Sequence, residues 1–519
     1  MLVHARIRAF LLGVAIFGNL ACKVTGAAQL HEGVGSRGAE LQCQIGIIGG
    51  GPAGVYAAYK LAVKLHRKGV CLFERDEVLG GRFRDEEFTT TDGTMVQVGT
   101  GARRINETHT MSIKLAKELG IELQKVEKRA QLINIGDRHG FSPDDFADMV
   151  PPIPGFQRDS APNTSLEDEL YSFLMKTKNR ARVTPELSFR QYVELVAGGP
   201  KTYTFLRAVS RFRGDFDYDL SAKNYLEYLE EELKLSMVNF YPVGGMSAFV
   251  RALAEKAQSA PGAPASIKTG EPLTAFEAMP NGNGYMLHTS HYNVPVRQLI
   301  ITPGPMGFDK IGGKLADAIR ARPEYKALVP IRVVIINQQW ETAWWLKARL
   351  DASGIPPWRS WTTEHCIHHT EIPQEAYLAK TFVVRAVYSE DPKCVTHWET
   401  LNNQGGLDAV AAAARIGLSQ VFGVDVPAPK KTTMKLWSGG WYYTRPGTLV
   451  SNKGIAEWSV EPLAGRRDLM LAGEAWWGDR PGWSTGAYLS VDKLLAARFS
   501  DGLSAQGSAL TDSLQGGKR

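Results

Sequence analysis

Residues 45–54 read Ile-Gly-Ile-Ile-Gly-Gly-Gly-Pro-Ala-Gly, and this stretch decides the fold. A short apolar run ends in glycines spaced G-x-G-x-x-G, and residues 55–68 then carry apolar side chains at helical spacing. A second apolar run, residues 70–73, follows at once. The sequence therefore predicts a β-α-β unit whose first turn is rich in glycine.

The glycines of this turn suit the binding of a dinucleotide. Gly49 allows a tight turn, Gly51 lets a pyrophosphate approach the backbone, and Gly54 lets helix and strand pack closely. The free amide groups at the start of the helix then attract phosphate. Glu74 ends the second apolar run, where a carboxylate can accept hydrogen bonds from a ribose. A glycine-rich turn without a ligand is the structural alternative, and it leaves Glu74 unexplained.

Length and composition indicate a globular protein of two or three domains. The 519 residues exceed one ordinary domain, and 22% charged with 44% hydrophobic residues argues against wholesale disorder or a membrane bundle. The net charge is +6 with scattered basic residues, so nucleic-acid binding is not expected. Apolar segments 296–302 and 468–472 could join the strands near residue 45, which would make the nucleotide domain discontinuous in sequence.

The N-terminal segment has the order of features found in a secretory signal. Arg6 and Arg8 precede an apolar block over residues 9–21, and small residues 26–28 offer a cleavage site. A lipoprotein signal ending at Cys22 and an uncleaved anchor are the alternatives. We expect residues 1–27 to be cleaved on export, which gives an extracellular or lumenal protein without stable membrane insertion.

The five cysteines do not have the spacing of a disulfide framework. Cys22 is expected to leave with the signal, and Cys71 lies in an apolar run, where a buried inert thiol is the simplest interpretation. Cys366 and Cys394 could pair if the protein is exported, because oxidising compartments allow disulfides.

Three histidines, His365, His368 and His369, lie close to Cys366. A zinc site needs a second ligand pair at a defined spacing, and the sequence offers none here. The segment is therefore interpreted as a polar loop, and no metal is expected.

Motifs near the two ends of the chain indicate which dinucleotide cofactor is bound. Gly80-Gly81-Arg82 follows Glu74 closely, and residues 471–475, Leu-Ala-Gly-Glu-Ala, precede residues 482–487, Gly-Trp-Ser-Thr-Gly-Ala. Together these motifs resemble the flavin-containing amine oxidase superfamily, most of all its secreted L-amino-acid oxidases. The resemblance covers residues 43 to 494 and implies one extended FAD held between the two ends of the chain.

The resemblance also implies a role for several side chains. Glu74 would hold the adenosine ribose, and Arg82 would lie along the pyrophosphate and ribityl region. Glu474 would bond the ribityl chain, and Trp483 would lie near the flavin ring. A helix start with glycine packing is the alternative for residues 482–487. The predicted cofactor contacts are Gly49, Gly51, Pro52, Ala53, Gly54, Glu74, Arg75, Gly81, Arg82, Gly101, Ala102, Arg103, Gly473, Glu474, Gly482, Trp483 and Ser484.

The expected fold is α/β, with a Rossmann-like FAD-binding domain built on a parallel sheet that is discontinuous in sequence. A mixed-sheet substrate domain and a helical insertion would complete it. The predicted boundaries are 1–27 for the signal peptide, 43–107, 238–310 and 446–498 for the FAD-binding domain, 108–237 for the helical and substrate region, 311–445 for the substrate-binding domain, and 499–519 for a disordered tail.

The segment Gly101-Ala102-Arg103-Arg104-Ile105 carries the substrate prediction. L-amino-acid oxidases have a similar Gly-x-x-Arg segment, and the resemblance implies that Arg104 binds the substrate carboxylate. A planar guanidinium grips a carboxylate through two hydrogen bonds, which an amine without a carboxylate could not use. A surface salt bridge or a contact to the FAD phosphate is the alternative, and the adjacent Arg103 leaves the assignment open.

Two aromatic segments complete the predicted site. Residues 386–389, Ala-Val-Tyr-Ser, resemble a strand whose tyrosine donates its hydroxyl to the same carboxylate, which points to Tyr388. Residues 435–443 resemble the Gly-Gly-Trp segment of the secreted oxidases, so Trp441 and Tyr443 are expected to line the substrate pocket. Ordinary core packing is the alternative for both segments.

One position departs from the superfamily. Its members usually have a lysine here that holds a water against flavin N5, and the alignment gives Arg332. Arginine cannot give up its proton and hydrogen-bonds in a different geometry. The sequence therefore leaves open whether the reduced flavin reacts with oxygen, as in an oxidase, or not, as in a dehydrogenase. The catalytic candidates are Arg104, Tyr388, Trp483 and Arg332.

The predicted reaction is oxidative deamination of an L-amino acid by hydride transfer from Cα to flavin N5. Oxygen then takes the electrons, and the products are a 2-oxo acid, ammonia and hydrogen peroxide. An amine or polyamine oxidase for substrates without a carboxylate is one alternative. A low-turnover flavoprotein with a binding or defence role is the other. The expected partners are a small amino acid or amine and molecular oxygen, with the oligomeric state open, a homo-oligomer included.

Overall fold

The computed structural model describes residues 41–499 apart from 91, 128–129, 159–163, 236–237, 281 and 479–481. The predicted signal peptide and the chain beyond Phe499 lie outside the described residues. Phe499 itself is 3% exposed and packs in the core that contains the glycine-rich unit. The predicted tail therefore cannot begin at residue 499, because that side chain belongs to the folded part.

Within the described residues, five strands form a parallel sheet in the order β10-β2-β1-β14-β20. Branched apolar residues fill strands buried on both faces, as parallel sheets require. Segments 296–302 and 468–472 contribute strands to it, so the predicted discontinuous parallel sheet is confirmed. The strands are β1 (Ile45–Ile48), β2 (Val70–Phe73), β10 (Ser266–Lys268), β14 (Gln298–Ile301) and β20 (Leu469–Leu471).

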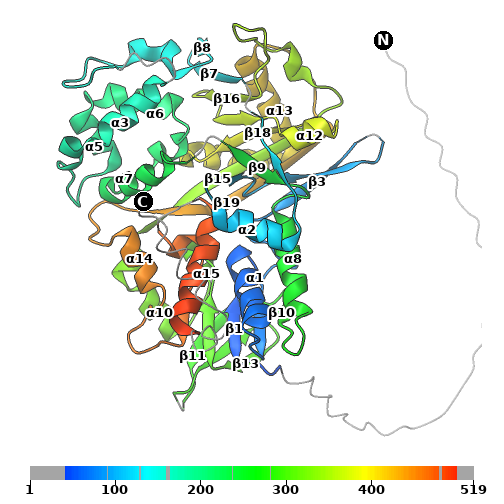
Figure 1. The fold of residues 1–519 in the computed structure, drawn as a ribbon. Helices are drawn as coiled ribbons and strands as arrows, with labels where there is room; N and C mark the ends of the chain where they lie inside the picture. The colour runs from blue at the N-terminus through cyan, green and yellow to red at the C-terminus, as the bar shows by residue number, and fades with distance from the viewer. Residues whose placement is uncertain are drawn as a thin grey trace, which may run out of the picture. The chain divides into compact units, whose positions relative to one another are not determined.

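Helix α1 (Pro52–Tyr59) starts directly after the glycine turn. Pro52 opens it, since its fixed φ and missing N–H suit a first helical position. The helix continues as a π-helical turn, η1 (Lys60–Lys64), so the predicted helix over 55–68 ends early. Figure 1 shows α1 beside α8 (Ser247–Gln258) and α15 (Ser484–Arg498), and the three helices share one apolar core with the sheet.

A mixed sheet forms the second part of the fold, in the order β19-β15-β18-β17-β16-β7-β8. Its strands pair antiparallel except β16 and β7, which are parallel. The expected mixed-sheet architecture is therefore confirmed. The strands are β7 (Gln131–Ile135), β8 (Arg138–Gly140), β15 (Leu328–Gln339), β16 (Arg359–Thr362), β17 (His369–Glu371), β18 (Val383–Ser389) and β19 (Lys431–Thr444).

Helices between residues 143 and 232 pack on one side of this sheet, with a shared core that includes Ile331 and Tyr443. The predicted helical region, residues 108–237, also contains β7 and β8, so it is not purely helical. These helices are η2 (Pro143–Met149), α3 (Leu166–Leu174), α4 (Thr177–Arg180), α5 (Phe189–Val196), α6 (Pro200–Val209), η3 (Arg213–Asp217) and α7 (Ala222–Glu232).

The remaining elements connect or cover the two large sheets. The strands are β3 (Asp85–Thr89), β4 (Met95–Gly99), β5 (Ile105–Asn106), β6 (Leu123–Lys125), β9 (Asn239–Pro242), β11 (Leu273–Ala278), β12 (Tyr285–Thr289) and β13 (Asn293–Val296). The helices are α2 (Thr110–Leu119), α9 (Pro305–Phe308), α10 (Lys314–Arg320), α11 (Pro323–Lys326), η4 (Trp344–Lys347), α12 (Gln374–Leu378), α13 (Pro392–Phe422), α14 (Asn452–Trp458) and η5 (Glu474–Trp476).

Two disulfides join segments that the fold brings together. Cys43 pairs with Cys71, because β1 and β2 are neighbours and Cys43 lies just before β1. The interpretation of Cys71 as an inert thiol was wrong, since strand pairing is a tertiary relationship. Cys366 pairs with Cys394 in the first turn of α13.

The predicted polar loop at residues 365–369 is also wrong in part. His368 is 4% exposed and His369 is 5% exposed, and His369 stacks on Trp361 at a ring distance of 4.1 Å.

The part of the chain that the structure describes holds no group of three or more His, Cys, Asp or Glu side chains arranged for a metal ion. None of its helices combines the length and hydropathy needed to cross a bilayer.

Candidate active site

Two adjoining cavities lie where the parallel and mixed sheets meet, and they share several lining residues. The first is lined by the start of α1, the segment around Arg82, strands β15 and β19, and the start of α15. The second extends from it toward η3 and α7. The shared residues are Gly101, Ala102, Tyr388, Trp441, Gly482, Trp483 and Ser484.

The glycine turn and Glu74 form one compact unit. The Gly50 amide donates to Oε2 of Glu74 at 2.5 Å, and the Asp76 amide donates to Oε1 at 2.8 Å. Glu74 is 8% exposed, so this carboxylate is held at the turn by backbone donors. Gly81 lies directly against the turn, because a Cβ added to it would lie 3.2 Å from the Cα of Gly51. The two glycine segments thus leave bare backbone where a pyrophosphate would approach.

The far end of the chain meets this unit through Arg82. Its Nη1 donates to Oε2 of Glu474 at 2.7 Å and to the Gly440 carbonyl at 2.6 Å. Oε1 of Glu474 accepts from the Gly482 amide at 3.0 Å. Arg82, Glu474 and Gly482 therefore form one hydrogen-bonded group at the first cavity, although their segments are far apart in sequence.

The helix starts at the cavity suit an anionic, polar cofactor. Neither α1 nor α15 has a side-chain cap, so the amides of their first turns are open to a ligand. The Ser484 hydroxyl at the start of α15 lines the cavity, and it is buried without a hydrogen-bond partner. A buried hydroxyl without a partner costs free energy, and a bound polar group would satisfy it. The residues present therefore fit a dinucleotide cofactor.

The four predicted substrate contacts, Arg104, Tyr388, Trp441 and Tyr443, line the second cavity, and so does Trp483, which was predicted to lie near the flavin ring. Among the described residues, the Arg104 guanidinium has no hydrogen-bond or ion-pair partner, although it is partly buried. A cationic group held open toward a cavity is suited to an anionic ligand.

Arg103 differs from its neighbour. Its guanidinium pairs with Glu371 at 2.5 Å and with Glu375 at 2.9 Å. Both arginines line the second cavity, but two buried carboxylates engage the Arg103 guanidinium, whereas the Arg104 guanidinium has no partner among the described residues. The predicted cofactor contact of Arg103 is corrected accordingly, because two carboxylates already engage its guanidinium.

Arg332 is not brought to the site. Val333 and Ile335 line the first cavity. Because side chains alternate between the two faces of a strand, Arg332 lies on the other face of β15. There its guanidinium pairs with Glu399 of α13 at 2.8 Å, with a side chain 36% exposed. No lysine lines either cavity among the residues that the structure describes.

The aromatic residues are fixed by polar partners. The Trp483 indole N–H donates to Glu232 at 2.8 Å, and its ring meets His109 edge-on at 4.4 Å. The Tyr443 hydroxyl donates to Oδ2 of Asp215 at 2.9 Å. Burial raises the pKa of Tyr388 well above its ordinary value, so its hydroxyl remains a hydrogen-bond donor at neutral pH.

Three acidic residues of the cavity were missed from the sequence, Asp215, Glu232 and Glu390. Burial is the largest cause that raises the pKa of Asp215 to about 7 and that of Glu390 to about 8. Glu390 follows Tyr388 by two residues, so the period-2 pattern of a strand could have placed both on one face. Asp215 is brought in by η3, and no local motif marks it.

The comparison with known families decides the class of the protein. Residues 52–490 match the model of the flavin containing amine oxidoreductase family. The chain belongs to this family. That match covers most of the chain, so the predicted cofactor, FAD, and the oxidoreductase class are confirmed.

The solved structures with a similar fold have low sequence identity to this chain. A putrescine oxidase double mutant with redesigned cofactor binding has a similar fold, with a TM-score of 0.62 at 13% identity over 89% of this chain and 100% of that chain. An Exiguobacterium sp. 255-15 protein, provisionally described as a protoporphyrinogen oxidase, gives 0.62 at 14% identity over 90% and 100%. At such identities these matches establish the fold of this flavin amine oxidoreductase and nothing finer.

Aplysianin-A of Aplysia kurodai is 29% identical over 116 residues, or 22% of this chain. The matched segment spans 20% of the length of Aplysianin-A. The substrate of this flavin amine oxidoreductase must therefore be inferred from the residues of its own site.

Proposed function

We propose that this protein oxidises L-α-amino acids to 2-oxo acids, with release of ammonia and hydrogen peroxide. The observation that carries the proposal is the Arg104 guanidinium, which faces the cavity without a partner among the described residues. An α-carboxylate would satisfy it through two charge-assisted hydrogen bonds. Bound FAD supplies the hydride acceptor and the route of electrons to oxygen.

The chain's own residues would orient the substrate. Tyr388 lines both cavities, and its neutral hydroxyl can donate to the same carboxylate that Arg104 binds. Trp441 and Trp483 line the same space and exclude water beside the reacting carbon. The carboxylate contacts fix the position of Cα, so orientation is the main contribution of the protein.

An amine or polyamine oxidase is the second candidate. Asp215 and Glu390 line the cavity and could hold a cationic amine in place of a carboxylate-bearing substrate. That function makes Arg104 dispensable, whereas amino-acid oxidation makes it essential.

A peroxidase-coupled assay tests the proposal. The purified holoenzyme is incubated with single L-amino acids, with their D-isomers, and with putrescine and spermine. We expect hydrogen peroxide from at least one L-amino acid and none from its D-isomer. Turnover of the polyamines with no response to any L-amino acid would contradict the substrate class, and a colourless protein that takes up no FAD would contradict the whole proposal.

We also propose that the protein is exported. The charged, apolar and small residues of segment 1–27 support a signal peptide. The disulfides Cys43–Cys71 and Cys366–Cys394 suit an oxidising compartment. Mass spectrometry of the mature N-terminus tests this, and an intact Met1 in the secreted or membrane fraction would contradict cleavage.

A further inference from the structure

Glu390 lies at the wall of the substrate cavity and has no role in the orientation of the carboxylate described above. It follows Tyr388 by two residues, so the two side chains leave the chain on the same face. Both line the second cavity, and Glu390 is 8% exposed. A substrate whose carboxylate is bound at Tyr388 would therefore have its amino group close to this carboxyl group.

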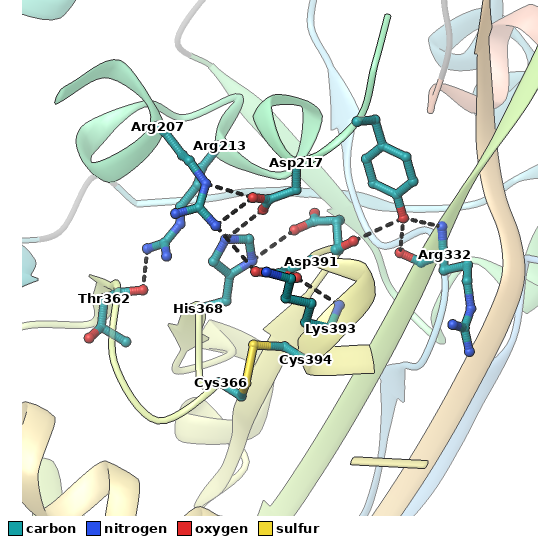
Figure 2. Close-up of polar contacts among 12 residues, drawn as sticks. Arg207, Arg213, Asp217, Arg332, Thr362, Cys366, His368, Asp391, Lys393 and Cys394 are labelled. Carbon is teal, nitrogen blue, oxygen red and sulfur yellow. Dashed lines mark hydrogen bonds and ion pairs between the residues drawn. A yellow bond between two sulfur atoms is a disulfide. The ribbon is translucent and has the colours of Figure 1, made fainter. Parts of the chain in front are cut away.

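A row of ionisable groups leads away from Glu390, and Figure 2 shows three of its members, His368, Asp217 and Arg207. Nδ1 of His368 lies 3.2 Å from Oε2 of Glu390, and Nε2 lies 4.0 Å from Oδ2 of Asp217. Asp217 pairs with Arg207 at 2.5 Å, and the Arg207 side chain is 36% exposed. The row thus connects the cavity to the protein surface. The 4.0 Å separation of His368 and Asp217 exceeds a hydrogen bond, so these two groups must approach one another for a proton to pass. Catalytic hydrogen bonds often tighten in this way when substrate binds.

His368 is placed to pass a proton between two carboxyl groups. Its ring is 4% exposed, and neither ring nitrogen has a hydrogen-bond partner of ordinary geometry. Burial lowers its pKa well below the ordinary value, and nearby Arg213 and Arg207 lower it further. The ring is therefore neutral at rest, with one nitrogen able to accept a proton while the other donates.

The charges around Glu390 come from three segments. Asp215, Asp217, Arg213 and Tyr218 face it from η3 and the residue that follows, His368 faces it from the loop before β17, and Tyr388 from its own strand. Burial is the largest cause of its raised pKa of about 8, and the negative charges of Asp215 and Asp217 add to it. A base is most effective when its pKa lies near the working pH, and Glu390 meets that condition.

We propose that Glu390 is the base that takes the proton from the substrate ammonium, and that His368 and Asp217 pass this proton toward the surface at Arg207. This inference rests on the proposed function. One N–H bond of the ammonium breaks, its electron pair stays on nitrogen, and an O–H bond forms on Glu390. Glu390 then protonates Nδ1 of His368 as Nε2 releases its proton to Asp217, which returns Glu390 to the carboxylate form. Asp217 releases the proton to bulk water beside the partly exposed Arg207, and this returns Asp217 to its carboxylate form.

The Cys366–Cys394 disulfide links the two segments that carry the first two groups of this relay. Cys366 lies two residues before His368, and Cys394 lies four residues after Glu390. Figure 2 shows the disulfide beside His368 and Asp391. His368 and Glu390 are thus positioned by a covalent link between their segments.

The test is the pH dependence of flavin reduction in Glu390→Gln holoenzyme, measured anaerobically with a turned-over L-amino acid. Glutamine keeps the shape and cannot accept the proton. We expect a rate on the order of 100-fold below wild type near pH 7, with the deficit shrinking as the pH rises and the substrate amine becomes neutral in solution. Glu399→Gln is the matched control, because Glu399 is an exposed partner of Arg332, and it should follow wild type at every pH.

A deficit that is the same at every pH would show a merely structural role and overturn the proposal, as would a rate equal to wild type. Infrared spectra give a readout that needs no turnover. Wild type should show a protonated-carboxyl component that disappears as the pH rises through about 8, beside the components of Asp215 and Glu167, and Glu390→Gln should lack this one component. Its persistence in the variant would exclude Glu390 as the titrating group.

Asp217→Asn is a second variant that keeps Glu390. Removal of a negative charge lowers the pKa of Glu390, so the inflection of the rate profile should move to lower pH. An unmoved inflection would contradict the relay. If the wild type reduces its flavin only with polyamines, the proposed function fails, and the same pH series with that amine still decides the role of Glu390.

Discussion

Arg82 and Glu474 are separated by 392 residues in the chain, and their side chains form an ion pair of 2.7 Å at the cofactor cavity. Arg82 follows the glycine segment that faces the dinucleotide turn, and Glu474 opens η5 after the last parallel strand. The pair shows that the FAD site is complete only when both ends of the chain have folded together. Binding of FAD should therefore stabilise the whole nucleotide domain.

Gly51→Ala should reduce bound FAD and leave the fold intact. A Cβ at residue 51 would meet only the Cα of Gly81, at 3.9 Å, so the folded chain has room for it. The methyl group would stand where the pyrophosphate approaches the backbone. The ratio of flavin to protein absorbance after dialysis measures the effect, and full retention of FAD would contradict it.

Gly54→Ala is the matched comparison within the same turn. Its Cβ would lie 1.8 Å from the carbonyl oxygen of Gly49, so the helix must move away from the turn. We expect a lower thermal unfolding midpoint in addition to the loss of FAD. A midpoint equal to that of Gly51→Ala would show that helix and turn do not pack as the structure describes.

Arg104→Ala should raise the KM for the amino acid by about 10- to 100-fold, because a charge-assisted hydrogen bond contributes about 1.5–3 kcal/mol. Thermal stability should not change, since the guanidinium has no partner among the described residues. Steady-state kinetics and an unfolding scan measure both effects. An unchanged KM would remove Arg104 from the substrate site.

Arg103→Ala should lower the stability of the protein, in contrast to Arg104→Ala, which should change the KM. It leaves Glu371, which is 4% exposed, without its closest cation. The loss of one partner of a buried ion pair costs about 3–5 kcal/mol. Unfolding in denaturant should show this destabilisation, and a variant of normal stability with a raised KM would exchange the roles of the two arginines.

Replacement of both Cys366 and Cys394 by serine should lower the free energy of unfolding by about 3–4 kcal/mol. The bond closes a loop with a sequence separation of 28 residues, and the chain-entropy model gives this magnitude for such a loop. Denaturant unfolding of the variant without reductant, with Cys43–Cys71 intact, measures it. Equal stability of variant and wild type would show that the bond does not form or does not restrict the unfolded chain.

Glu167→Gln should make stability less sensitive to pH. Burial raises the pKa of Glu167 in the folded protein from 4.5 to about 7, while Arg211 lowers it. The folded state thus keeps a proton that the unfolded state releases, so this contribution to stability is complete below about pH 4.5 and is lost as the pH rises through 7.

Glutamine has no proton to lose and can still accept from the Arg211 amide. The thermal midpoint of the variant relative to wild type should therefore increase between about pH 5 and pH 8. Unfolding scans at both pH values decide this, and a constant difference between the two proteins would show that Glu167 does not titrate in that range.

The architecture was largely predictable, because its main signals are local. The glycines between residues 49 and 54 require a strand, a turn and a helix in that order, whatever surrounds them. Apolar runs at 296–302 and 468–472 also predicted strands of the same sheet. The family motifs then brought both ends of the chain to one cofactor, which the Arg82–Glu474 pair bears out.

The partners of individual side chains were not predictable to the same degree. Adjacent arginines 103 and 104 look alike in sequence and both line the cavity, yet only Arg103 is paired with buried carboxylates among the described residues. Arg332 was placed one face away from where β15 directs it, and the Cys43–Cys71 bond depends on two strands that pair only after folding.

Asp215 and Glu390 make the same point for the chemistry of the site. The pKa values of both groups are raised by desolvation and by nearby negative charge, that of Asp217 for Asp215 and those of Asp215 and Asp217 for Glu390. Both effects exist only where distant elements close around these groups. Local spacing thus determined which elements form and predicted a dinucleotide site, and the resemblance to the family predicted FAD as the cofactor. Long-range packing decided which ionisable groups surround the substrate, because burial and neighbouring charge are properties of the folded chain.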